Sequence, residues 1–174
     1  TLLAEPMKLE LRRAARYYYL RFVRLKGHPG VLARGVAIGT FVGITPTIPF
    51  HTILSLLFAF ILRGSKIAAL FSTIIVSNPI TFLPQYYLSW QIGNWLTPGK
   101  HSWKDVSILI DAIINGGKFG ETLTALGQIG MESLIILLAG GMVLALPFTL
   151  FFYCLSYMLF RSIQKKQLEK KILK

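Results

Sequence analysis

The sequence predicts an all-α integral membrane protein, and three observations support this fold class. Hydrophobic residues make up 53% of the 174 residues and charged residues only 15%, a balance that is too apolar for a single soluble core. Several uncharged stretches are long enough to enter or cross a hydrocarbon core about 30 Å thick. Two of these stretches are broken by pairs of prolines. Since backbone polar groups in lipid must be satisfied internally, each break predicts a place where other protein or a water-filled cavity meets the freed groups.

Positive charge is concentrated at the two ends of the chain. Nineteen Lys and Arg residues stand against seven Asp and Glu residues, which gives a net charge of +12. Seven of the bases lie in residues 8–26 and six in residues 161–174, beside apolar segments. This is the distribution that the positive-inside rule describes, so we expect both termini in the cytoplasm and no nucleic-acid partner.

The N-terminal segment predicts a basic helix that lies in the membrane interface. Residues 5–26 mix six arginines and lysines with leucines and aromatic side chains before the last base, Lys26. Such a helix binds the anionic lipids of a cytoplasmic leaflet. A solvated helix docked on a partner domain has a similar composition and is the alternative.

Residues 31–62 predict a re-entrant hairpin. The segment has one charge near its start, Arg34, and Pro46 and Pro49 at its middle. Each proline removes a backbone donor and clashes with a preceding carbonyl, so we expect two half-helices of roughly 20 Å, too short to cross. Thr47 is expected to cap the second half. Glycines at every fourth position allow another helix to pack closely on the first half: Gly35, Gly39 and Gly43.

Residues 67–96 hold no charge and predict a second broken membrane helix after a basic turn at 63–66. Asn78 is a good N-cap and Pro79 a good first helical residue. Pro84 conflicts with this start, because its ring clashes with the carbonyl four residues earlier. Two alternatives follow: a short turn before a helix that begins near Pro84, or a kink at Pro84.

The remaining chain predicts an outer loop, a full span and a tail. Residues 97–132 are glycine-rich and contain four of the seven acids, which predicts an amphipathic loop on the extracytoplasmic face. Residues 133–160 are twenty-eight uncharged residues and predict a transmembrane helix with a kink at Pro147. Residues 161–174 follow as a basic cytoplasmic tail, so residues 1–174 form one membrane domain.

Two basic ends on one side of the membrane require an even number of crossings. If residues 31–62 are the re-entrant hairpin, residues 67–96 cross outward and residues 133–160 return. A competing arrangement makes 67–96 re-entrant and puts the basic turn outside. In a third arrangement both broken segments are re-entrant from the cytoplasm, and part of residues 117–130 dips into the membrane.

A series of motifs in the first half of the chain resembles a known bacterial family. A glycine-spaced helix is followed by a proline-rich turn with a polar pair, a short basic loop and a Ser-Asn-Pro turn that leads into a Pro, Tyr and Gly run. In this order the chain is similar to the family called domain of unknown function 2062. The matching positions are Gly35, Gly39, Gly43, Pro46, Pro49, His51, Thr52, Ser77, Asn78, Pro79, Pro84, Tyr86, Tyr87 and Gly93.

The resemblance covers residues 17–99 and, more weakly, the last helix. It implies a location in the bacterial inner membrane. Together with the charge pattern, this predicts a multi-pass protein with both termini in the cytoplasm. Because the same domain can be joined to glycosyltransferase-like domains, it also implies a link to envelope glycan or lipid-carrier chemistry. It brings no established activity.

Polar residues at the two breaks form the candidate binding site. Broken helices that direct their N-termini into a shared gap are a recurring transporter device for holding an anionic group. A phosphate suits this field, with arginines at the mouth as counter-charges. The candidate residues are Thr45, Thr47, His51, Thr52, Ser77, Asn78, Gln85, Arg34 and Arg63. The plainer interpretation is that these groups only cap the half-helices, while Pro46, Pro49, Pro79 and Pro84 only shape the fold.

Two functions follow from these features. One is a transporter-like protein that binds or moves an anionic substrate such as a lipid-carrier phosphate, as a homo-oligomer because two crossings and a hairpin give little wall for a pathway. The other is a non-catalytic scaffold that recruits envelope-synthesis enzymes through its basic helix or its glycine face. No nucleophile, phosphate-loop or metal-ligand motif is present in the sequence, so we expect neither enzyme activity nor a cofactor or metal.

Overall fold

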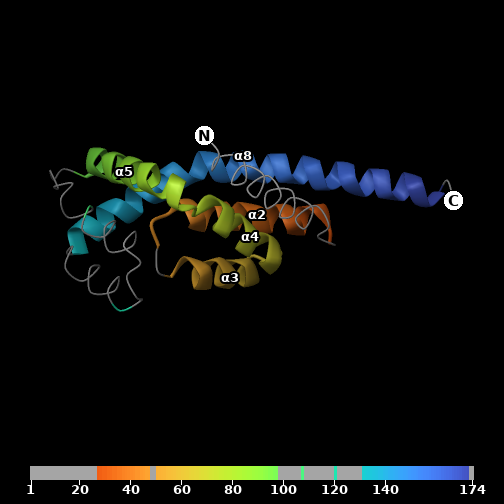
Figure 1. The fold of residues 1–174 in the computed structure, drawn as a ribbon, viewed down its shortest axis with the longest axis horizontal. Coiled ribbons are helices and arrows are strands. Elements are labelled where there is room, and N and C mark those ends of the chain that lie inside the picture. Colours follow the sequence, from red (N-terminus) through yellow and green to blue (C-terminus); the bar gives the residue numbers. More distant parts are fainter. Residues whose placement is uncertain (1–26, 48–49, 98–106, 108–119, 121–130, 173–174) are drawn as a thin grey trace, which may run out of the picture.

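The structure is a computed structural model that describes residues 27–47, 50–97, 107, 120 and 131–172. Within these ranges the chain is helical and has no strand, which confirms the all-α prediction there (Figure 1). The helices are α2 (Pro29–Ile44), α3 (His51–Ile61), α4 (Lys66–Val76), α5 (Pro79–Leu96) and α8 (Met131–Ile172). The predicted helix at 5–26 and nearly all of the predicted loop at 97–132 lie outside the described residues.

Local capping explains where two of the short helices begin. The Nδ1 atom of His28 accepts a hydrogen bond from the amide of Gly30 at 3.2 Å. Pro29 takes the first position of α2, where no amide donor is needed. Ser65 begins α4 in the same way, because its hydroxyl oxygen accepts from the amide of Ala68 at 3.3 Å.

Helices α3 and α5 begin differently from the prediction. The expected cap of α3 by Thr47 is wrong: the N-cap is Phe50, which makes no side-chain cap bond. The Thr47 hydroxyl instead lies near carbonyl oxygens at the end of α2. Helix α5 begins at Pro79 and continues through Pro84. The chain therefore bends before Pro79, where proline costs no helical hydrogen bond.

Helices α2, α3 and α4 form a three-helix unit in which α2 and α4 are parallel. Along their contact, Gly35 meets the backbone of Ser65 at one end and Gly43 meets Val76 at the other. Helix α3 runs in the opposite direction to α2 and α4 and packs on both of them. The turn after α3 returns to the start of α2, where the amide of Ser65 donates to the carbonyl of Val31 at 3.0 Å.

Glycines, which have no side chain, allow the backbones of α2 and α4 to approach closely. A Cβ atom on Gly39 would overlap the carbonyl oxygen of Ala69 and the Cβ of Ser72. A Cβ atom on Gly35 would overlap the carbonyl oxygen of Ser65. Contacts of this kind, between small residues on facing helices, are the usual way in which helices associate in membranes.

Helix α8 is 42 residues long and its first half packs on α5. Glycines again remove side chains from the contact, because a Cβ atom on Gly140 would overlap the carbonyl of Ser89 and the amide of Gly93. The helix continues through Pro147 and through residues 161–172. Residues 161–172, which were expected to form a separate tail, therefore belong to the end of α8.

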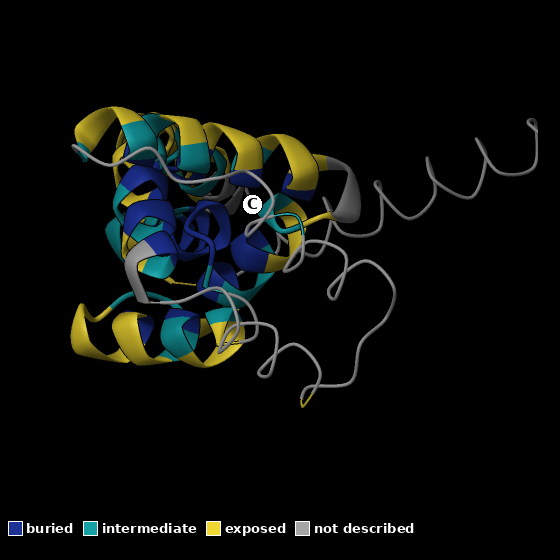
Figure 2. Cartoon of the chain, turned by 90° about the vertical axis from the view of Figure 1, so that its left-hand side faces the viewer, coloured by how far each residue is buried: buried dark blue, intermediate teal, exposed yellow. Residues whose placement is uncertain are grey.

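The second half of α8 runs antiparallel to α2. Phe160 is buried in a cluster with Leu32, Val36 and Ala68, which come from α2 and α4. Figure 2 shows that the buried residues face the space between the helices, while the outward faces are exposed.

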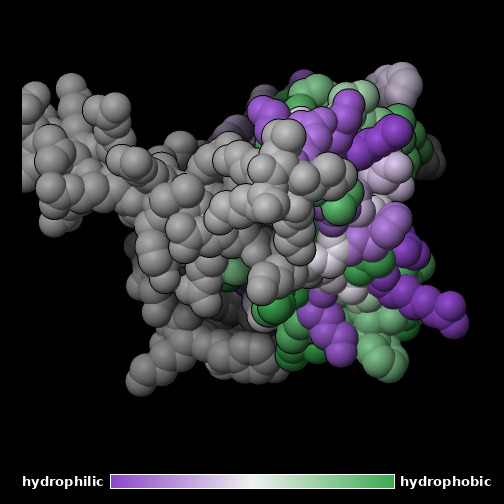
Figure 3. Space-filling model, turned by 90° about the vertical axis from the view of Figure 1, so that its right-hand side faces the viewer, coloured by the Kyte–Doolittle hydropathy of each residue, from purple (hydrophilic) through white to green (hydrophobic). Residues whose placement is uncertain are grey.

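The start of α2 and the end of α8 lie at the same end of the molecule. There the side-chain amide of Gln164 donates to the carbonyl of Gly27 at 2.5 Å. Viewed from this side, the described surface carries many hydrophilic side chains (Figure 3). The α3–α4 turn lies nearby, so its bases Arg63 and Lys66 are at this end as well. We call it the basic end.

One helix in the described ranges is long and apolar enough to cross a membrane. It covers Ser133–Lys166, within α8. A second candidate is the bent pair of Lys66–Val76 and Thr81–Leu96, whose two parts are inclined by 88°. Helices α2 and α3 are apolar but shorter.

We expect Gly39→Ala to destabilise the protein, because the added methyl group must push α2 and α4 apart. Overpacking of this kind costs about 1–3 kcal/mol, which should lower the thermal unfolding midpoint of the detergent-solubilised protein. Gly30→Ala is the matched control, since a Cβ atom there meets only the His28 side chain at 3.4 Å or more. Equal midpoints for the two variants would contradict the importance of the α2–α4 contact.

Candidate functional site

The two helix breaks lie side by side, although they are about thirty residues apart in sequence. The first break joins α2 to α3, and the second joins α4 to α5. The hydroxyl of Ser77, in the second break, donates to the carbonyl of Gly43 at the end of α2, at 3.0 Å. Pro46, in the first break, packs against α8, where a Cβ atom on Gly141 would overlap its ring. The parallel packing of α2 and α4 is what brings the two breaks to the same level.

Threonine hydroxyls of the first break lie against backbone carbonyls at and after the end of α2, and two of these carbonyls also accept from backbone amides. The hydroxyl of Thr45 donates to the carbonyl of Phe41 at 2.8 Å. The hydroxyl of Thr47 lies 3.4 Å from the carbonyl of Val42 and 3.3 Å from the carbonyl of Thr45. A hydroxyl has a single proton, so Thr47 donates to one of these carbonyls at a time.

The second break uses its polar side chains in the same way. The carbonyl of Val76, at the end of α4, accepts from the Thr81 hydroxyl at 2.6 Å and from the Gln85 side-chain amide at 3.3 Å. The backbone amide of Asn78 donates to the Thr81 hydroxyl oxygen at 3.2 Å. The Asn78 side chain is exposed, and Pro79 and Pro84 both belong to α5.

Two further candidate residues open α3. His51 is the first residue of the helix and is half-buried, and its Nδ1 atom is buried with no hydrogen-bond partner in the described part of the chain. Thr52 follows it and is exposed. Among the described residues, therefore, no group forms a hydrogen bond with the Nδ1 atom of His51.

These contacts define what the paired breaks can do chemically. The hydroxyls place their protons on carbonyls at the negative ends of α2 and α4, which lowers the negative field that an anion would meet. Helix α3 starts beside the gap, and its N-cap Phe50 makes no side-chain cap bond, so no such bond offsets the positive field at this end of the helix. The same bonds also suffice for helix capping, so a role of these residues in binding stays a prediction.

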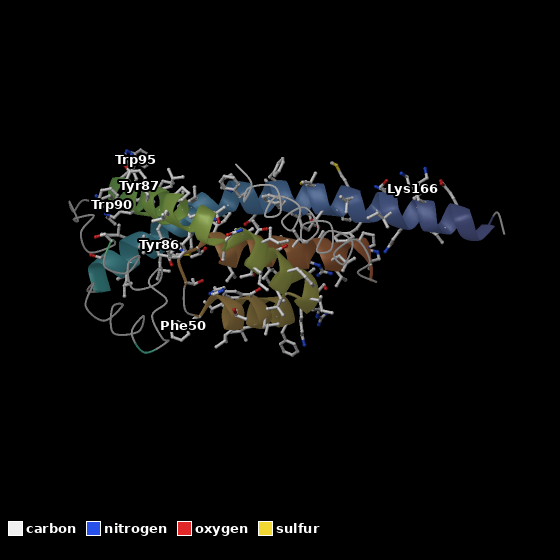
Figure 4. All side chains as sticks on the ribbon, viewed as in Figure 1. Phe50, Tyr86, Tyr87, Trp90, Trp95 and Lys166 are labelled. Carbon is white, nitrogen blue, oxygen red and sulfur yellow. The ribbon has the colours of Figure 1, made fainter. Side chains whose placement is uncertain are left out.

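The structure does not bring Arg34 and Arg63 to the breaks. The Nε atom of Arg34 donates to the carbonyl of Gly30 at 3.2 Å, and its Nη1 atom donates to the carbonyl of Leu62 at 3.4 Å. Both arginines are therefore at the basic end, and a rise of 1.5 Å per residue puts Arg34 roughly 16 Å from the start of the first break. Figure 4 shows the same separation: Phe50 marks the break and Lys166 the basic end.

A buried hydroxyl pair connects the three short helices and was not predicted from the sequence. Thr73 on α4 lies 2.9 Å from the hydroxyl of Ser55 on α3 and 3.2 Å from the carbonyl of Gly39 on α2. Ser55 has no exposed surface and Thr73 only 1%. The available signal was a hydroxyl in each of two apolar helices, since a polar group in lipid needs a partner.

The described residues provide no group of three or more His, Cys, Asp or Glu side chains that could hold a metal ion. Cys154 is a free, exposed cysteine on α8. Pro49 lies outside the described residues, so nothing is added to its predicted role as a helix breaker.

Comparison with protein families identifies the chain. The family model DUF2062, described as an uncharacterized protein conserved in bacteria, matches residues 12–169. The chain belongs to this family. The resemblance seen in residues 17–99 is thus confirmed, and the family match extends through the last helix. DUF2062 carries no described activity, and neither a curated protein nor a solved structure matches the chain.

We expect Ser77→Ala to loosen the contact between the two breaks, because it removes the donor to the Gly43 carbonyl. A loss of about 1 kcal/mol corresponds to a roughly fivefold change in an equilibrium, so a cysteine placed at Thr47 in a Cys154→Ser background should react about five times faster with a water-soluble thiol reagent. Ser156→Ala is the control, because that hydroxyl bonds only within α8. An unchanged labelling rate at position 47 would show that the bond does not hold the breaks together.

Proposed function

We propose that the protein is a transporter-like protein of the bacterial inner membrane that binds an anionic group, such as a lipid-carrier phosphate, at the paired helix breaks. The observation that carries this proposal is the contact between Ser77 and Gly43, at 3.0 Å, which joins the two breaks. A single break is most simply a kink in a helix. Two adjacent breaks give a gap at which two helices end and two others begin.

The ligand would be held mainly by backbone amides and by His51. The start of α3 has no side-chain cap, and helix N-termini attract phosphate through free amides and the helix dipole. The unpartnered Nδ1 atom of His51 lies on the same turn. No carboxylate lies in either break to repel an anion.

The lengths and directions of the helices support a hairpin topology. Helices α2 and α3 have 16 and 11 residues, or roughly 24 Å and 16 Å, against about 30 Å for the hydrocarbon core. In the proposed topology α2 enters the membrane from the basic end and α3 returns to that end. The α4–α5 pair then crosses outward, and α8 crosses back. The contact of Gln164 with Gly27 supports a common side for the two basic ends.

Oligomerisation belongs to the proposal because one chain offers little wall for a pathway. Many large apolar side chains of α3 and α8 face outward, among them Ile53 at 64% and Leu150 at 66% exposure. These faces suit lipid or a second copy equally, so a homo-oligomer is part of the proposal and not a separate finding.

The second candidate function is a membrane scaffold for envelope-synthesis enzymes. It is favoured by the fact that the hydroxyls of Thr45, Ser77 and Thr81 already donate to backbone carbonyls. In this function the breaks only end helices, and partners bind the basic N-terminal segment or an outward helix face.

Complementation of a deletion strain separates the two functions. If the breaks bind substrate, His51→Ala and Asn78→Ala should lose most activity, about tenfold or more for a charge-assisted contact, at unchanged abundance in the membrane. If the protein is a scaffold, both variants should complement fully, whereas charge reversal at Arg12, Arg13 and Arg16 should not. Ser162→Ala, an exposed change on α8, serves as the control.

A cysteine map tests the topology. In a Cys154→Ser background, cysteines at Ser65 and Ser162 should react with a membrane-impermeant reagent only after lysis, because both belong to the basic, cytoplasmic end. A cysteine at Ser102 should react in intact cells. Reaction of position 65 in intact cells would mean that residues 31–62 cross the membrane and are not a hairpin.

A further inference from the structure

A groove of about 510 Å³ lies between α2, α3 and α8. Its walls are apolar side chains of α2 and α3, including Ala37, Phe41, Phe58 and Leu62. No described residue of either break lines it, so it is separate from the site discussed above. The volume falls within the range of about 300–1,000 Å³ that is usual for ligand pockets.

Among the described residues of the lining, two carry polar side chains. Thr149 of α8 contributes a hydroxyl that is buried and has no hydrogen-bond partner in the described structure. Arg34 is exposed and belongs to the basic end. Two turns of α2 separate Arg34 from Phe41, so a charge at one end of the groove is followed by apolar surface toward the other. Apolar cavities stay dry and take up apolar ligands.

The guanidinium of Arg34 is fixed and still has donors to spare. Its bonds to the carbonyls of Gly30 and Leu62 connect α2 to the end of α3 and hold the side chain beside the groove. A guanidinium has five N–H donors, and these two bonds leave three. Arg63 and Lys66, both exposed, add positive charge at the same end.

We propose that this groove binds an acyl chain of an anionic phospholipid, whose phosphate is held by Arg34. Charge complementarity and the order of the lining select this occupant: a phospholipid has its anionic group at one end and hydrocarbon after it. A helix fits less well, because one turn about 10 Å wide and 5.4 Å long already fills roughly 400 Å³. The inference does not depend on the proposed function, since a transporter and a scaffold could both carry this lipid.

The test uses the full-length protein in vesicles of phosphatidylcholine with a minor fraction of phosphatidylglycerol that carries a photoreactive diazirine on one acyl chain. After irradiation, mass spectrometry locates the adducts. We expect them to concentrate at Phe41 and Phe58. Ala37→Trp, which fills the groove, should reduce these adducts at least fivefold. Leu150→Trp, on the outward face of α8, is the matched control and should leave them unchanged.

A second variant tests the headgroup contact and keeps the test valid if Ala37→Trp does not fold. Arg34→Gln should reduce groove labelling by phosphatidylglycerol about fivefold. Labelling by a diazirine phosphatidylcholine, whose choline charge opposes binding at the basic end, should start lower and fall less. Arg63→Gln removes one charge from the same end without changing the groove lining, and it should have a small effect.

Two results would overturn the proposal. Adducts spread evenly over the outward faces, and insensitive to both groove variants, would identify ordinary surrounding lipid. Absence of adducts at Phe41 and Phe58 in the unmodified protein would mean that a protein segment, from this chain or a partner, fills the groove. Neither result bears on the breaks, whose role is measured by complementation with the His51 and Asn78 variants.

Discussion

The structure depends on one constraint: a carbonyl freed at a helix end needs a donor where water is scarce. At the breaks, side chains of the chain itself provide these donors. Thr47 lies within reach of the Val42 carbonyl at the end of α2, Thr81 and Gln85 donate to the end of α4, and Ser77 reaches across to the Gly43 carbonyl. Short polar side chains thus supply donors to carbonyls at the ends of two helices that prolines interrupt.

Close packing of α2 on α4 makes these bonds possible. Ser77 and Thr73 have short side chains, and they reach carbonyls of Gly43 and Gly39 only because no Cβ atom separates the two backbones. The glycines and the hydroxyls therefore act together, and a change that separates the helices removes both kinds of contact. This coupling is also what sets the two breaks at one level.

Most helix positions could be predicted from the sequence, because proline, glycine and charge mark their ends directly. The break after α2 and the basic turn at 63–66 follow from such local signals. Asn78 and Pro79 also signalled a helix start, but Pro84 predicted a later start or a kink, and α5 continues through it. Partners across helices could not be predicted, since the pairing of Ser55 with Thr73 depends on how α3 and α4 are rotated. Arg34 and Arg63 were assigned to the mouth of the breaks, but a hairpin that turns at the first break places both arginines at its open end, roughly 16 Å away.

The unequal lengths of the helices have a consequence for the surrounding bilayer. The uncharged part of α8, residues 133–160, extends over roughly 42 Å, whereas α2 and α3 extend over roughly 24 Å and 16 Å. A flat hydrocarbon layer about 30 Å thick matches neither. In a membrane, α8 would have to tilt strongly, and the bilayer beside α2 and α3 would have to thin. Lipids on that side would then pack in a thinner bilayer than lipids beside α8.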